Sequence, residues 1–92
     1  MAIVIHFAPR NMNASKYAEV LRRLEAAGEG APRGRLHHTC YGPSEQLSVV
    51  DVFDTPQSFE AFGRTLVPIL QGLDIELGQP VVTEVHNVIR GS

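Results

Sequence analysis

The sequence predicts an α+β domain with four strands and two helices. Four short runs are rich in β-branched and aromatic residues, and two longer segments repeat apolar residues at helical spacing. The hydrophobic fraction of 43% and the charged fraction of 20% are typical of an ordinary globular protein. With 92 residues, the chain is expected to form a single domain over residues 1–92.

The first part of the chain predicts a strand and a helix. Residues 2–7 are apolar on both of the faces that alternate along a strand, and Pro9 ends this run. Asn13 or Ser15 is the expected N-cap of the helix, and Gly28 is expected to end it. The apolar face of this helix is formed by Tyr17, Val20, Leu21 and Leu24.

A hairpin is expected next, after a loop rich in Gly and Pro over residues 29–35. Residues 36–41 and 47–53 predict two strands joined by a short turn. Thr55 is then the expected N-cap of the second helix, with Pro56 in its first turn.

The second helix and a last strand complete the chain. The apolar stripe of the helix must be buried, whereas Pro68 predicts a kink or a new short turn over residues 67–71. Residues 81–89 predict the last strand. This order fits a ferredoxin-like βαββαβ fold, with a four-stranded antiparallel sheet and both helices on one face.

The strands carry apolar residues on both faces, but two helices can cover only one of them. A second copy of the chain is the simplest cover for the other face, so we expect a homodimer with its two sheets face to face. A chain of 92 residues is also marginally stable alone, which favours association. Each protomer would then enclose a small barrel-like cavity.

Composition argues against several classes of protein. The net charge of −2 and the scattered arginines argue against a nucleic-acid partner. No apolar run approaches the roughly 20 residues that span a bilayer, and the N-terminus lacks a leader pattern, so we expect no membrane partner. Cys40 is the single cysteine, which excludes a disulfide within the chain and favours a cytoplasmic protein.

Asp51 stands between two valines in an apolar strand, so it should be paired if it is buried. His37 and His38 point to opposite faces of the preceding strand, and the hairpin register decides which of them lies across from Asp51. A histidine beside a carboxylate in an enclosed space suits a general base. The same pair could instead only satisfy each other and fix the dimer.

His38 and Cys40 share one face, but two ligands do not complete a metal site, and Cys40 is more typical of a small buried side chain. The glycines do not form a phosphate or dinucleotide motif. We therefore expect neither a metal nor another cofactor.

The hairpin, the segment VVDVFDTPQSFEAF, the following LVP and the closing VHNVI resemble the dimeric α/β-barrel superfamily. Within it, the chain is similar to small proteins related to antibiotic biosynthesis monooxygenases, over essentially its whole length. The resemblance favours His38 as the partner of Asp51. It also singles out Phe53, where many such proteins have Trp, and the terminal pair His86 and Asn87.

The resemblance implies a cofactor-independent oxygenase, or a related isomerase or lyase, that acts on a small aromatic or polyketide-like substrate between sheet and helices. His38, Asp51 and His86 are the expected catalytic residues. The expected substrate-binding residues are Tyr41, Phe53, Asn87, His37 and His6. The alternatives are a non-catalytic dimer that binds a ligand or partner, and a haem protein, for which the chain has no distinctive sequence.

Overall fold

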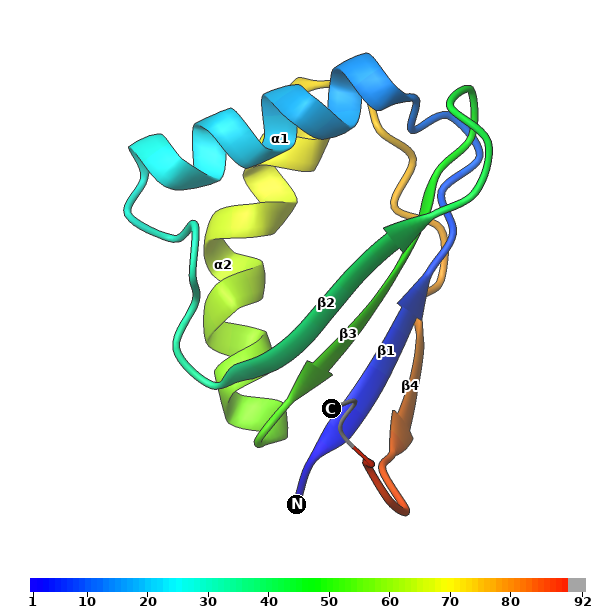
Figure 1. Ribbon diagram of the computed structural model, residues 1–92. Helices are drawn as coiled ribbons and strands as arrows, with labels where there is room; N and C mark the ends of the chain where they lie inside the picture. Colours follow the sequence, from blue (N-terminus) through cyan, green and yellow to red (C-terminus); the bar gives the residue numbers. More distant parts are fainter. Residues whose placement is uncertain (90–92) are drawn as a thin grey trace.

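The computed structural model describes residues 1–89, and its elements follow the predicted order. The four strands form one antiparallel sheet in the order β2-β3-β1-β4. Both helices cover the same face of this sheet (Figure 1), so the predicted ferredoxin-like α+β fold is confirmed. The elements are β1 (Ile3–Phe7), α1 (Ala14–Ala26), β2 (Arg35–Tyr41), β3 (Ser48–Phe53), α2 (Pro56–Gly72) and β4 (Val81–Glu84).

Both helices begin at side-chain caps. Of the two candidates for α1, the cap is Asn13, whose Oδ1 accepts a hydrogen bond from the backbone N–H of Lys16 at 2.8 Å. The Oγ1 of Thr55 accepts from the N–H of Ser58 at 3.1 Å and caps α2 as predicted. These bonds satisfy N–H groups that have no partner within the helix.

The new turn expected over residues 67–71 does not form, because α2 continues through Pro68 to Gly72. The expected kink at Pro68 stays a prediction. Proline removes one N–H from the helix and leaves the carbonyl of Arg64 without its usual partner. Arg64 and Pro68 are both exposed, so water can satisfy that carbonyl.

The last strand is shorter than the predicted range 81–89, because β4 ends at Glu84. Among residues 1–89, β4 pairs with β1 alone, and Glu84 lies opposite Ile3, where β1 begins. Just beyond the strand, the N–H of Val85 donates a hydrogen bond of 3.0 Å to the carbonyl of Ala2. The ladder therefore stops because its partner strand stops.

The core lies between the sheet and the helices. Phe53 is fully buried, and its ring contacts Phe59 and Phe62 with centroids 5.5 and 5.7 Å apart. The other buried members are apolar side chains from both layers and from the connecting segments: Ile3, Ile5, Met12, Val20, Leu24, Val49, Leu70 and Ile75. This packing fixes α1 and α2 against the strands that carry the candidate site.

The opposite face of the sheet, here called the open face, carries side chains that point away from both helices. Its exposed residues include Tyr41 at 43% and Val81 at 59%. The strand registers place the following residues on it: Val4, His6, His37, Thr39, Tyr41, Ser48, Val50, Val52, Val81 and Thr83. Among the described residues, no helix combines the length and apolar character needed to cross a bilayer.

Candidate functional site

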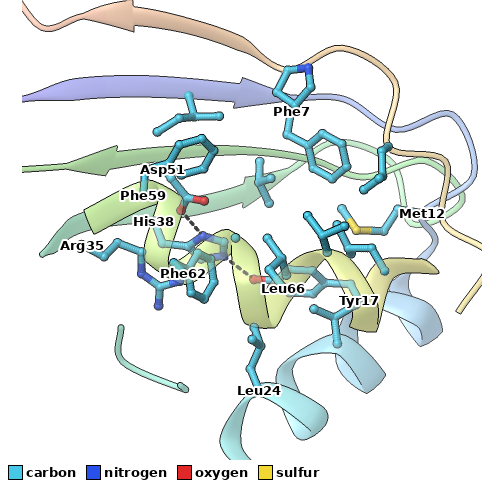
Figure 2. A pocket seen from close by; sticks show the side chains of 18 of the residues that line it. Phe7, Met12, Tyr17, Leu24, Arg35, His38, Asp51, Phe59, Phe62 and Leu66 are labelled. Carbon is cyan, nitrogen blue, oxygen red and sulfur yellow. Dashed lines mark hydrogen bonds and ion pairs between the residues drawn. The ribbon is translucent and has the colours of Figure 1, made fainter. Parts of the chain in front are cut away.

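A cavity of about 120 Å³ lies between the sheet and the two helices. Most of its wall is apolar, and Figure 2 shows the side chains around it. Four polar residues also line it, namely Tyr17, Arg35, His38 and Asp51. Some lining residues, such as Leu21 and Val67, are exposed, so the cavity reaches the molecular surface.

Three of the polar residues form one hydrogen-bonded chain. His38 on β2 lies opposite Asp51 on β3, and His38 Nδ1 is 2.5 Å from Asp51 Oδ1. His38 Nε2 is 2.7 Å from the hydroxyl oxygen of Tyr17, which projects from α1 (Figure 2). The side chains of His38 and Asp51 are 23% and 12% exposed, so these hydrogen-bonded groups are largely removed from water.

Donors and acceptors in this chain follow from its geometry. A carboxylate accepts only, so His38 Nδ1 carries a hydrogen and donates it to Asp51. In the neutral imidazole, Nε2 is then the acceptor, and the Tyr17 hydroxyl donates to it. The arrangement can therefore pass a proton from Tyr17 to His38 while Asp51 stabilises the imidazolium that results.

Burial raises the pKa of Tyr17 above its usual value of 10.0, and the neighbouring Cys40 and Asp51 raise it further. The positive charge of Arg35 acts in the opposite direction. At neutral pH, Tyr17 is therefore a protonated hydroxyl that can donate. Burial also raises the pKa of the Cys40 thiol, although a hydrogen bond with Tyr17 opposes this, so Cys40 is a weak nucleophile.

The structure brings together two of the predicted catalytic residues, His38 and Asp51, in the register that the resemblance favours. His86 follows β4 and is exposed. It does not line the cavity, so its catalytic role stays a prediction.

None of the predicted substrate-binding residues lines the cavity. His6, His37 and Tyr41 lie on the open face, where His6 Nε2 is 2.5 Å from the Tyr41 hydroxyl. Phe53 is fully buried in the core, and Asn87 is exposed beyond β4. Their roles in binding a substrate stay predictions.

Two cavity residues were missed by the sequence-based prediction. Tyr17 was assigned to the apolar face of the first helix, but a tyrosine that faces a core needs a partner for its hydroxyl, which was the available signal. Arg35 was assigned to a loop. It enters the cavity because of an irregularity in β2, for which the sequence carries no clear signal.

Among residues 1–89, no cluster of three or more His, Cys, Asp or Glu side chains is arranged to hold a metal ion. His38 and Cys40 share a face of β2, but His38 uses both of its ring nitrogens in the hydrogen-bonded chain.

Solved structures with the same architecture cover nearly the whole chain. A proposed antibiotic biosynthesis monooxygenase from Chloroflexus aurantiacus aligns with a TM-score of 0.68 and 14% identity, over 98% of each chain. The chain has the fold of antibiotic biosynthesis monooxygenase-like proteins. SnoaB, a cofactor-independent oxygenase from Streptomyces nogalater, aligns with a TM-score of 0.63 and 14% identity, over 98% of this chain and 96% of SnoaB.

A protein of unknown function from Nitrosomonas europaea, NE2512, has the same fold, with a TM-score of 0.60 and 12% identity over 99% of this chain and 93% of its own. At these identities the likeness concerns the fold alone, because one fold hosts many activities. No family model matches the sequence.

One curated protein resembles the sequence itself. The DNA primase small subunit PriS of Cenarchaeum symbiosum is 27% identical over 82 residues, which make up 89% of this chain. The chain spans only 22% of the length of that protein.

Proposed function

We propose that this protein is an enzyme that removes a proton from a small aromatic substrate bound in the cavity between sheet and helices. The observation that carries the proposal is the hydrogen-bonded group Tyr17–His38–Asp51, which lies in the wall of a largely apolar cavity. A few polar groups that converge on an apolar pocket are typical of catalytic sites.

Tyr17 stands at the end of this chain, because its hydroxyl occupies His38 Nε2. A phenolic substrate would give its O–H proton to the Tyr17 oxygen while the Tyr17 proton moves to His38 Nε2. Asp51 stabilises the resulting imidazolium through Nδ1. The products of this step are a substrate phenolate and a protonated His38, so charge and protons balance.

Molecular oxygen is the proposed second substrate. The phenolate transfers an electron to dioxygen, and the two radicals join in a C–O bond at the ring carbon opposite the phenol oxygen. His38 returns its proton through Tyr17 to the peroxide. Loss of the hydrogen on that carbon and of hydroxide, together as water, leaves a quinone. One oxygen atom enters the product and the other leaves as water, and the electrons come from the substrate itself.

The volume of the cavity favours a small substrate. An apolar cavity of about 150 Å³ can hold a benzene molecule, and this cavity measures about 120 Å³. The cavity is thus somewhat smaller than one that encloses benzene, but it opens to the surface. A single ring whose small substituents reach the opening therefore suits it better than a polycyclic polyketide.

The proposal includes a homodimer in the cytoplasm, formed through the open face. The exposed apolar residues on that face, among them Tyr41 and Val81, favour a cover by a second sheet. Val50 lies on the open face in the central part of the sheet, so Val50→Lys is expected to yield monomers. Sedimentation tests this, and a wild-type chain that stays monomeric at micromolar concentration contradicts the dimer.

The test of the activity uses two neighbouring histidines. Oxygen uptake and quinone absorbance are measured with a panel of single-ring phenols for the wild type, His38→Gln and His37→Gln. Because general-base catalysis contributes about 10²–10⁴-fold, His38→Gln is expected to lose at least about a hundredfold in kcat. His37→Gln should keep its activity, since His37 lies on the open face and does not line the cavity. A folded His38→Gln protein with normal turnover refutes the proposal.

A second candidate is a non-catalytic dimer that binds a ligand. It is favoured by the absence, among residues 1–89, of buried side-chain polar atoms without a hydrogen-bond partner. Tyr17, His38 and Asp51 satisfy one another, as a purely structural group would. In that case the wild type consumes no oxygen with any phenol of the panel, and His38→Gln changes stability alone.

A further inference from the structure

Arg35 reaches the cavity because of a β-bulge. His38 pairs with Asp51 and His37 with Val52, but the next partner of β3, Phe53, pairs with Arg35 rather than with Leu36. The extra residue shifts the alternation, so that Arg35 shares the helix-facing side with His38. Leu36 is left 55% exposed. Bulges next to active sites often re-aim a side chain in this way.

The loop before β2 is held in place at the point where it delivers Arg35. Gly34 has a φ of 87°, and a Cβ there would come within 2.5 Å of the side chains of Asp54 and Ser58. The Gly34 carbonyl accepts a hydrogen bond from the N–H of Asp54 at 2.8 Å. The backbone at Arg35 is therefore fixed against the start of α2.

The positive charge of the Arg35 guanidinium is not neutralised by a nearby carboxylate of the described residues. Arg35 is half-buried and lies over the ring of Phe62, with Cζ 5.8 Å from its centroid. Its hydrogen-bond partner among the described residues is the Gly30 carbonyl at 3.3 Å, and it forms no ion pair with any carboxylate of residues 1–89. Most of its five donors thus remain available in an apolar wall.

The charge of Arg35 also acts on the proton-transfer chain. It opposes the burial that raises the pKa of Tyr17, so its field reaches the Tyr17 hydroxyl. Figure 2 shows Arg35 near His38 and Phe62, and well away from Met12 and Phe7. The cavity therefore has a cationic end and an apolar end.

We propose that the cavity binds a single-ring aromatic acid, whose carboxylate pairs with Arg35 and whose phenol lies against Tyr17. The inference rests on the proposed function, since it names the substrate class of the same site. A planar carboxylate matches the paired donors of a guanidinium. Asp51 pairs with His38 and not with Arg35, so the charge of Arg35 is left to hold the anion at this end of the cavity.

The test measures binding and needs no turnover. Titration calorimetry compares 3-hydroxybenzoate with 3-hydroxybenzamide, which has the same shape and no charge. Because hydrogen bonds to a charged group contribute about 1.5–3 kcal/mol, the wild type is expected to bind the acid at least about tenfold more tightly. Arg35→Met should reduce this preference to less than about twofold. Arg33→Met, an exposed arginine of the same loop, should keep it.

Equal affinity of the wild type for acid and amide overturns the proposal, as does a lack of binding of both compounds. A preference that survives in Arg35→Met overturns it as well. The wild-type comparison decides the question even if Arg35→Met does not fold, and Arg35→Lys, which keeps the charge, should retain part of the preference. Turnover of neutral phenols without any preference for acids refutes this inference alone. Preferred binding of the acid without oxygen uptake refutes only the proposed chemistry.

Discussion

Gly63→Ala is expected to stabilise the protein. Gly63 lies within α2 at the wall of the cavity, and a Cβ there would meet no heavy atom within 4 Å. Replacing an interior helix glycine by alanine contributes about 1 kcal/mol. The added methyl group gains little packing because nothing lies close to it. The net gain is therefore about 1 kcal/mol, which corresponds to a rise of roughly 4–8 °C in Tm for a domain of this size.

Gly28→Ala is the matched control. A Cβ at Gly28 also meets nothing within 4 Å, but its φ is 79°. An alanine in this left-handed region costs about 1–2 kcal/mol, so the same substitution in equally open space should have the opposite sign. Urea unfolding followed by circular dichroism measures both variants. A loss of stability in Gly63→Ala would refute the reasoning, because it would mean that a Cβ at this position clashes with neighbouring atoms of the cavity wall.

Two other substitutions test the polar contacts. Tyr17→Phe removes the hydroxyl bonded to His38 and should cost about 1 kcal/mol in urea unfolding; an unchanged midpoint argues against the hydrogen-bonded chain. Hydrogen bonds from Arg22 and Arg23 lower the pKa of Glu19 to about 2, from 4.5. A lowered carboxyl pKa stabilises the fold above pH 4.5, and this contribution is lost as the pH falls toward 2. Glu19→Gln should therefore weaken the decrease of Tm with falling pH in this range. An unchanged decrease of Tm in the variant would contradict this expectation.

Much of the fold could be predicted because its signals are local. Asn13 and Thr55 cap their helices through bonds to residues three positions away. The end of β4 was not predictable from its own residues, since it depends on where β1 begins. The continuation of α2 through Pro68 was not predictable either, because it depends on the exposure of that turn, which is a property of the folded molecule.

The candidate site was predicted only in part for the same reason. Period-two alternation separates His37 from His38, but the choice between them depends on the hairpin register. Tyr17 comes from another element, and its contact with His38 follows from how α1 packs on the sheet. Arg35 required a bulge that adds one residue to β2, and alternation alone would have placed Leu36 in the cavity.

The most direct test of the cavity as a proton-transfer site follows the histidine ring nitrogens by NMR while 3-hydroxybenzoate is added. If the phenol binds against Tyr17, the signals of His38 should shift and saturate, because His38 Nε2 lies 2.7 Å from the Tyr17 hydroxyl. Those of His37 and His6, on the open face, should stay unchanged. Saturable shifts at His37 or His6 with none at His38 would contradict the account and move the site to the open face.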